Sequence, residues 1–192
     1  MNLLVIIEDN FKDVELVTPL TIFQTSQKFN KIDFYNPTLK AAKGMLMNFA
    51  KIENIHNEIN INDYDMVFIP GGPGSQDLRK NLKSINIIKQ LYEKMNKKLV
   101  AICDAPNVLS EHKIIQNEKF SSYPTDWSSE YRTSNWTTEL ISKSNNKLYT
   151  GNSPYSSAKL AFMVIVEVFG YDVALKTYQI FAGSPDAKEI VL

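Results

Sequence analysis

The stretch "KKLVAICDAPNVLSEHKII", residues 97–115, joins a short apolar run to a segment of helical character, and the single cysteine of the chain lies at the junction. A continuous apolar run of this length is typical of a strand buried on both faces of a parallel sheet. Pro106 is compatible with a helix that starts just before it, because the first helical turn has unpaired amides anyway. We therefore expect a strand over 98–103, a sharp turn at Cys103 and a helix that ends near Glu111.

Apolar strands and amphipathic helices alternate on both sides of this stretch. The pattern predicts strands over 2–8, 31–36, 64–72 and 147–151, and helices over 13–27, 82–96, 156–170 and 171–180. Such alternation is the signature of an α/β fold, with a mostly parallel sheet and helices on both faces. No repeat or linker interrupts it, so we expect one domain over 1–192. Residues 39–56 are expected to form a hairpin or a short extended excursion, and 142–147 ("SKSNNK") a surface turn.

Two helices have more detailed expectations. Asp13 is a candidate cap for the first helix, whose inward stripe is expected to contain Val14, Val17, Leu20 and Phe23. The helix over 82–96 is expected to present one apolar face, made of Leu82, Ile85, Ile88, Leu91 and Tyr92.

Composition excludes several classes of function. Lysine plus arginine equals aspartate plus glutamate, at 21 each, and no basic stripe is present, so we expect no nucleic-acid partner and no membrane partner. One cysteine excludes an internal disulfide and fits a reducing cytoplasm. His56 and His112 do not form a metal-binding pair, so no metal is expected. The "PGGPGSQDL" segment lacks the lysine of a phosphate loop, and no cofactor is expected.

Candidate site residues lie at the carboxyl ends of the predicted strands, where α/β proteins bind ligands. A helix N-terminus would make the Cys103 thiol more acidic, whereas a buried and inert cysteine is an equally good interpretation of this stretch alone. The amides of Gly72 and Asp104 could form an anion hole, although glycine pairs more often simply make tight turns. The Asp104 carboxylate would oppose a thiolate if it lay near, or could point away and cap the helix. Taken alone, Glu15 is more readily a solvated surface residue.

Three motifs in this order resemble the DJ-1/ThiJ/PfpI superfamily, in its DJ-1-like branch: "FKDVELVTP" with Glu15, "FIPGGPG" with Gly72, and "AICDAP" with Cys103. The resemblance implies a flavodoxin-like sandwich, a homodimer, and a cysteine at a nucleophile elbow that is hydrogen-bonded to a protonated glutamate. It gives Cys103 as nucleophile or sensor, Glu15 as acid/base, and the Gly72 and Asp104 amides as the anion hole. Gly71 and Pro73 of the same turn would line the pocket.

The sequence departs from the family pattern at three positions. "FSSYP" places Tyr123 where relatives carry a histidine; Asp104 stands where a small residue is commoner, and Asn152 where relatives often have arginine. Asp104 and Asn152 should give the thiol a higher pKa than it has in other family members, and should disfavour anionic ligands. Asp126 is a candidate substitute for the histidine, or only a turn residue.

Neither histidine is expected to replace the missing one. His112 lies nine residues beyond Cys103, or about 13 Å along a helix with a rise of about 1.5 Å per residue, and His56 precedes a strand rather than following one. The aromatic residues Tyr123, Trp127, Trp136 and Tyr155 are expected either at the mouth of the pocket or in the core.

These observations favour a cysteine-dependent enzyme of the glyoxalase or deglycase type. Its substrate would be a small reactive carbonyl compound, with Cys103 as the nucleophile, Glu15 as the acid/base and Tyr123 in the place of the histidine. A redox-sensing protein, in which Cys103 is oxidised to a sulfinate stabilised by Glu15, is the main alternative. A third possibility is a family member with an inert thiol that functions by assembling with a partner.

Overall fold

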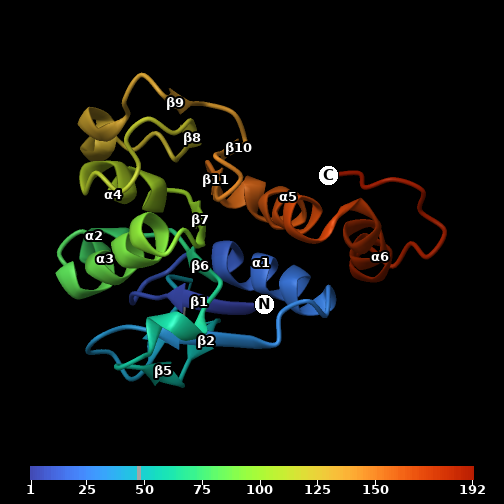
Figure 1. The fold of residues 1–192 in the computed structure, drawn as a ribbon, viewed down its shortest axis with the longest axis horizontal. Coiled ribbons are helices and arrows are strands. Elements are labelled where there is room, and N and C mark those ends of the chain that lie inside the picture. The colour runs from blue at the N-terminus through green and yellow to red at the C-terminus, as the bar shows by residue number, and fades with distance from the viewer. Residues whose placement is uncertain (47–48) are drawn as a thin grey trace.

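A seven-stranded sheet forms the centre of the computed structural model, which describes residues 1–46 and 49–192. The strand order is β10-β11-β7-β6-β1-β2-β5 (Figure 1). Neighbouring described strands run parallel, with β10 antiparallel to β11. The strands are β1 (Asn2–Ile6), β2 (Lys31–Tyr35), β5 (Ile55–His56), β6 (Met66–Ile69), β7 (Lys98–Ile102), β10 (Ile141–Ser144) and β11 (Leu148–Gly151).

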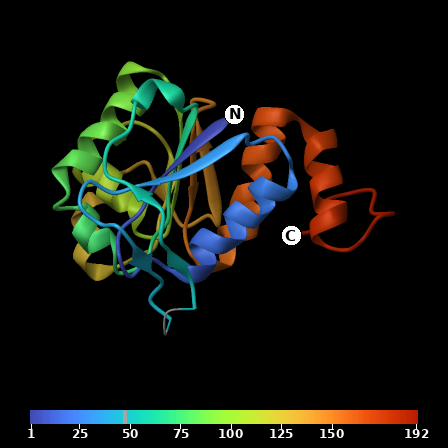
Figure 2. The ribbon, with the colours of Figure 1, turned by 90° about the horizontal axis from the view of Figure 1, so that it is seen from below.

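Helices cover both faces of this sheet, as the alternation in the sequence predicts. Figure 2 shows α2 (Ser75–Leu78), α3 (Leu82–Lys89) and α4 (Ala105–Glu111) on one side, and α1 (Asp13–Thr25), α5 (Ser157–Phe169) and α6 (Tyr171–Phe181) on the other. Successive residues of β1 enter opposite cores: Leu3 and Val5 pack toward α1 and α5, whereas Leu4 packs toward α3 and α4. Because side chains alternate along a strand, an apolar run without alternation buries both faces of the sheet.

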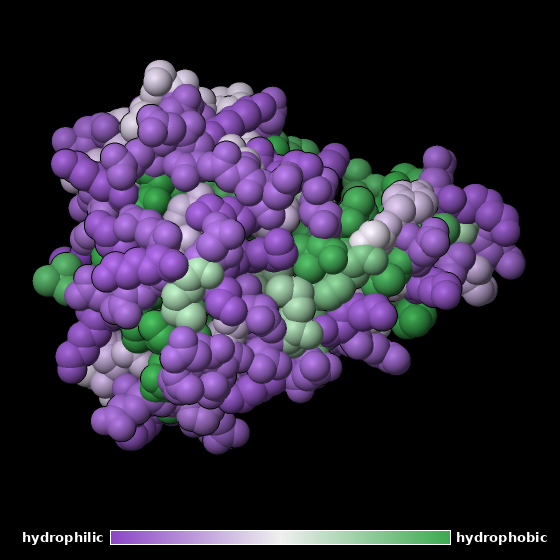
Figure 3. Space-filling view, in the orientation of Figure 1, coloured by the Kyte–Doolittle hydropathy of each residue, from purple (hydrophilic) through white to green (hydrophobic). Residues whose placement is uncertain are grey.

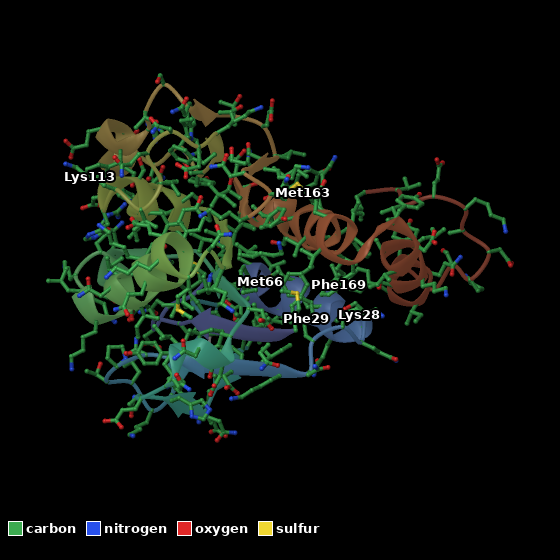
Figure 4. All side chains as sticks on the ribbon, viewed as in Figure 1. Lys28, Phe29, Met66, Lys113, Met163 and Phe169 are labelled. Carbon is green, nitrogen blue, oxygen red and sulfur yellow. The ribbon has the colours of Figure 1, made fainter. Side chains whose placement is uncertain are left out.

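The contact between α1 and α5 continues into an aromatic cluster at the end of α1. The ring of Phe29 lies 4.9 Å from that of Phe23 and 5.5 Å from that of Phe169, measured between centroids, and Figure 4 labels Phe29 and Phe169 beside each other. Figure 3 shows a mostly hydrophilic face, with apolar residues gathered where α5 and α6 lie. No described helix has the length and apolar character needed to cross a membrane.

The expectation for the inward stripe of α1 is wrong in part. Val14 and Val17 are 40% and 47% exposed, whereas Glu15, Leu16, Pro19, Ile22 and Phe23 are buried. The buried residues recur at spacings of three and four, so the stripe is a helical one that is rotated toward Glu15 and Leu16. Asp13 does not cap the helix; its carboxylate accepts the amides of Leu46 and Ala50 and so holds the neighbouring loop.

Other expectations also need correction. Leu82 is 63% exposed and does not join the apolar face of its helix; that helix changes at Gln90 into a π-helical turn, Gln90–Lys94. The segment expected as a turn at 142–147 contains most of β10, and the turn itself covers only 145–147. β10 is an edge strand that pairs only with β11, so it can carry polar residues, and its sequence therefore shows no apolar strand pattern.

The excursion expected over 39–56 is a hairpin followed by a strand. β3 (Ala42–Lys43) pairs antiparallel with β4 (Lys51–Ile52), and β5 then joins the main sheet beside β2. Positions 47–48 of this segment lie outside the described residues. A second small pair, β8 (Phe120–Ser121) and β9 (Trp136–Thr137), encloses the 3-10 segment η3 (Asp126–Tyr131), a region without a clear pattern in the sequence.

Candidate functional site

Cys103 occupies the turn between β7 and α4. Its φ of 64° lies in the left-handed region, which a residue with a Cβ adopts at a cost of about 1–3 kcal/mol. Backbone hydrogen bonds hold it there: its amide donates to the carbonyl of Gly151 (2.9 Å), and its carbonyl accepts the amide of Tyr123 (2.7 Å). The partly buried thiol therefore has a fixed position beyond the carboxyl end of a central strand.

The Glu15 side chain is fully buried and faces this thiol. Neither carboxyl oxygen forms a hydrogen bond of ordinary geometry within the described residues. Burial raises the pKa of Glu15 from 4.5 to about 7, and the thiol of Cys103, the charge of Lys12 and the backbone of Gly71 oppose this shift. A surface position for Glu15, favoured by its residue type alone, is thus wrong.

The thiol and the carboxyl group form a coupled pair. Burial raises the pKa of the Cys103 thiol, and the nearby Glu15 raises it further. The backbone amides of Gly72 and Asp104 act in the opposite direction, because they donate toward the sulfur. Two buried acids this close do not ionise independently, so above neutral pH they carry one negative charge between them.

Gly71 and Gly72 allow the close approach of Cys103, Glu15 and the backbone of Lys12. A Cβ on Gly71 would overlap the Cβ of Cys103 and lie 2.6 Å from Oε2 of Glu15. Gly72 has a φ of 100°, and a Cβ there would collide with the backbone of Lys12, whose amide donates to the carbonyl of Gly71 (2.9 Å). The "PGG" turn is therefore required by the contact between α1, β6 and Cys103.

The carboxylate of Asp104 does not cap α4. It enters a buried polar network, in which Oδ2 accepts Nη1 of Arg79 at 3.1 Å and Oδ1 accepts the Ser128 hydroxyl at 2.7 Å. Asn107, Thr125 and Trp127 also donate to this carboxylate. Arg79 carries a further ion pair with Glu111 (2.6 Å). The charge of Asp104 is thus compensated within the network, which the sequence could not reveal because Arg79 is 25 residues away.

A cavity of about 570 Å³ opens over the pair. It is lined by Lys12, Glu15, Met45, Gly72, Pro73, Gln76, Cys103, Asp104, Tyr123, Thr125, Trp127 and Pro154. The structure thus brings together seven of the residues selected from the sequence: Glu15, Gly72, Pro73, Cys103, Asp104, Tyr123 and Trp127. Trp136 and Tyr155, the other two aromatic residues considered for the mouth of the pocket, are absent from this lining. Three others are absent from this lining: Gly71 lies behind the pair, Asp126 begins η3, and the Asn152 side-chain amide donates to the carbonyl of Thr138.

Sequence reasoning did not select five residues that line the same cavity: Lys12, Met45, Gln76, Thr125 and Pro154. Lys12 directly precedes α1, so its position three residues before Glu15 was an available signal; the other four had none. The two histidines contribute nothing to the lining. His112 contacts the carbonyl of Arg79 (3.0 Å). His56 is the last residue of β5, not a residue before a strand as expected, and its Nε2 lies 3.8 Å from Oδ1 of Asp33 in β2.

A parallel α/β sandwich, with a thiol at a strand-to-helix turn above a buried acid, is shared by proteins of several activities and indicates a class rather than a single reaction. Within this class, the model of the DJ-1/PfpI family matches residues 1–167. The chain therefore belongs to the DJ-1/PfpI family, which confirms the resemblance seen in the three motifs.

Relatives and solved structures agree with this assignment. An uncharacterized protein of Mycoplasma genitalium is 32% identical over 172 residues, covering 85% of this chain and 86% of that protein. An uncharacterized protein of Methanocaldococcus jannaschii is 36% identical over 123 residues, 64% of this chain but only 58% of that protein. A protein named deglycase in Pyrococcus abyssi is 25% identical over 125 residues, 65% of this chain and 73% of that protein.

The fold is also that of solved family structures. Oxidized DJ-1 from Toxoplasma gondii superposes with a TM-score of 0.79, at 20% identity, covering 94% of this chain and 97% of that one. The expected sandwich fold, mostly parallel with helices on both faces, is thereby confirmed.

Proposed function

We propose that this protein is a cysteine-dependent enzyme that acts on small reactive carbonyl compounds, in the manner of a glyoxalase or deglycase. The observation that carries the proposal is the buried Glu15 carboxyl group against the Cys103 thiol, with both residues lining one cavity. That archaeal relatives are named deglycases supports the same kind of reaction.

The proposed chemistry begins with proton transfer inside the pair. Because the thiol pKa is raised, a free thiolate is scarce, and the Glu15 carboxylate takes the proton as sulfur attacks the aldehyde carbon. A carboxyl group whose pKa is about 7 can both accept and return a proton near neutral pH. The amides of Gly72 and Asp104 would hold the developing oxyanion, and Glu15 would pass to it the proton taken from the thiol, giving a neutral hemithioacetal and restoring the Glu15 carboxylate.

An α-oxoaldehyde would then isomerise without any oxidant. The Glu15 carboxylate would remove the proton from the former aldehyde carbon to give an enediolate, while the hydroxyl proton of that carbon passes to the neighbouring oxygen. Return of the carbon-bound proton from Glu15 to the neighbouring carbon then converts the hemithioacetal into a thioester of a 2-hydroxy acid. Water would cleave the thioester, release the 2-hydroxy acid and regenerate the thiol. Tyr123, at the cavity in place of a histidine, would act as a hydrogen-bond donor to the substrate oxygen rather than as a base, since the reference pKa of a tyrosine is about 10.

The direct test is the conversion of methylglyoxal into lactate by the purified protein. We expect turnover that Cys103→Ala and Glu15→Ala abolish, and that Tyr123→Phe lowers about 10-fold through loss of one hydrogen bond. Glu58→Gln, at an exposed glutamate, is the matched control and should leave the rate unchanged. Absence of lactate above the spontaneous rate with the parent protein would refute the proposed reaction.

A redox function is the second candidate, and one observation favours it: the thiol faces a carboxyl group that lacks another ordinary partner in the described residues. Peroxide would convert the thiol into a sulfinic acid, two peroxides being reduced to two waters, and protonated Glu15 would donate to the sulfinate. Intact-mass analysis after mild peroxide should give two added oxygens that Cys103→Ala removes and Glu15→Gln reduces; addition only at methionine would contradict it.

A further inference from the structure

One wall of the cavity is formed by Trp127, an exposed aromatic residue whose ring is held in a fixed position. Trp127 is 61% exposed and lines the cavity, yet its indole Nε1 donates to Oδ2 of Asp104 at 3.2 Å. Asp104 itself is buried, at 3% exposure. The ring therefore has a rigid attachment point directly beside Cys103, although most of its surface is open to solvent or to a ligand.

The chain on both sides of Trp127 is fixed by the same carboxylate. Oδ1 of Asp104 accepts the hydroxyl groups of Thr125 (3.1 Å) and Ser128 (2.7 Å), and Nη2 of Arg79 donates to Ser128 (2.7 Å). Residues two before and one after Trp127 are thus held in place, in addition to the indole itself. Such attachment restricts the rotamers of the ring and leaves less conformational entropy to be lost when a ligand packs against it.

The rest of the cavity is large and mainly apolar. Met45, Pro73, Tyr123 and Pro154 share the lining with Trp127, and the volume of about 570 Å³ falls within the range of about 300–1,000 Å³ typical of small-molecule sites. A three-carbon aldehyde on Cys103 would fill a small part of this space. An aromatic group attached to the same carbonyl would reach apolar surface that is otherwise exposed to water.

We propose that Trp127, held by Asp104, makes the site selective for carbonyl compounds with an aromatic or other bulky apolar substituent. Trp127 is the residue that determines specificity, and Asp104 is a positioning residue for it. The selectivity among substrates rests on the proposed carbonyl-directed function, but recognition of an aromatic group beside Cys103 does not, and the two can be measured separately.

Recognition is tested by alkylation of Cys103 with iodoacetamide and with its N-benzyl derivative. The ratio of the two rates is insensitive to the thiol pKa, because both reagents react with the same thiolate. In Trp127→Ala we expect the rate with the N-benzyl reagent, divided by the rate with iodoacetamide, to fall about three- to tenfold, because an aromatic contact is lost. Trp127→Phe keeps a ring but removes the N–H donor, and its ratio should lie between those of the parent and of Trp127→Ala.

Trp136 provides the matched control. Its Nε1 donates to the Ser122 hydroxyl (2.8 Å), and it is absent from the described lining of the cavity. Trp136→Ala and Trp136→Phe should leave the ratio within about twofold of the parent value. An unchanged ratio in Trp127→Ala would overturn the role of the ring, and a parental ratio in Trp127→Phe would overturn the role of Asp104.

Turnover provides the second measurement. The kcat/KM for phenylglyoxal relative to methylglyoxal should exceed one in the parent and fall by the same factor in Trp127→Ala. If the parent turns over neither aldehyde while the alkylation ratio still falls, the proposed enzyme function fails and the aromatic subsite stands. If both aldehydes react and neither ratio responds to Trp127→Ala, the function stands and the subsite fails.

Discussion

Replacing Glu15 by glutamine should change how the reactivity of Cys103 depends on pH. In the parent, ionisation of the pair is complete above a pH of about 7, and the single negative charge then resides mainly on Glu15 because the thiol pKa is raised. The population in which Cys103 is a thiolate and Glu15 is protonated consequently stops rising above that pH. In the Glu15→Gln variant the thiol titrates alone, so the thiolate fraction continues to rise tenfold per pH unit.

The magnitude follows from the pKa of the carboxyl group. Parent and Glu15→Gln should alkylate at similar rates below a pH of about 7, and the variant should become about 10-fold faster at pH 8 and remain faster at pH 9. The same variant should lose turnover of the carbonyl substrate, because the proton acceptor is gone.

The assay is the rate of iodoacetamide modification of the folded protein, followed by intact mass from about pH 5 to about pH 9, which spans the carboxyl pKa on both sides. Glu58→Gln should retain the plateau of the parent, since Glu58 is exposed and does not line the cavity. A parent rate that climbs tenfold per pH unit throughout this range, in parallel with Glu15→Gln, would refute the coupling of the two groups.

Three further predictions concern stability and packing around the same site. Because the folded-state pKa of Glu15 is raised from 4.5 to about 7, its contribution to stability is present at low pH and is lost as the pH rises through about 7. The unfolding free energy of Glu15→Gln minus that of the parent, measured with urea, should thus increase by about 3 kcal/mol between about pH 4 and about pH 8. A difference independent of pH would contradict this. Gly71→Ala, whose Cβ would overlap Cys103, should cost about 1–3 kcal/mol in the same assay and change the alkylation rate, and a parental value for both would show that the turn can relax. Arg79→Met should cost about 3 kcal/mol, because it leaves the buried carboxylate of Asp104 without its cation; Arg79→Met combined with Asp104→Asn should recover part of that loss, and strict additivity of the two changes would argue against the pairing.

The raised thiol pKa gives a specific meaning to the departures from the family pattern. The sequence suggested that Asp104 would oppose a thiolate, yet its carboxylate turns to Arg79 and the side chains of η3, and the opposing charge comes from Glu15. Asp104 consequently connects the thiol turn to the wall of the cavity. A substitution at this position in a relative is best interpreted together with the residues at 79 and 127.

Five of the seven strands of the main sheet, five of the helices beside it, the position of Cys103 at the end of a central strand, and the resemblance to the family all follow from the amino-acid sequence alone. These features are local: an apolar run over 98–102 must be covered on both faces, and the glycines at 71 and 72 are needed wherever a backbone passes this close to a side chain. Three motifs in fixed order resembled the DJ-1/PfpI family, and the family model over residues 1–167 confirmed that resemblance.

The burial of Glu15, the direction of Asp104 and the composition of the cavity wall emerge only from the folded chain. The stripe of α1 could be rotated by one residue without any change in its helical period, and only the packing of α1 on α5 and the sheet fixes which residues face inward. Arg79, Trp127 and Ser128 meet Asp104 from 25, 23 and 24 residues away, so no local pattern could place them together. Burial and charge pairing depend on neighbours in space, and these neighbours set both the pKa of the reactive pair and the shape of the site around it.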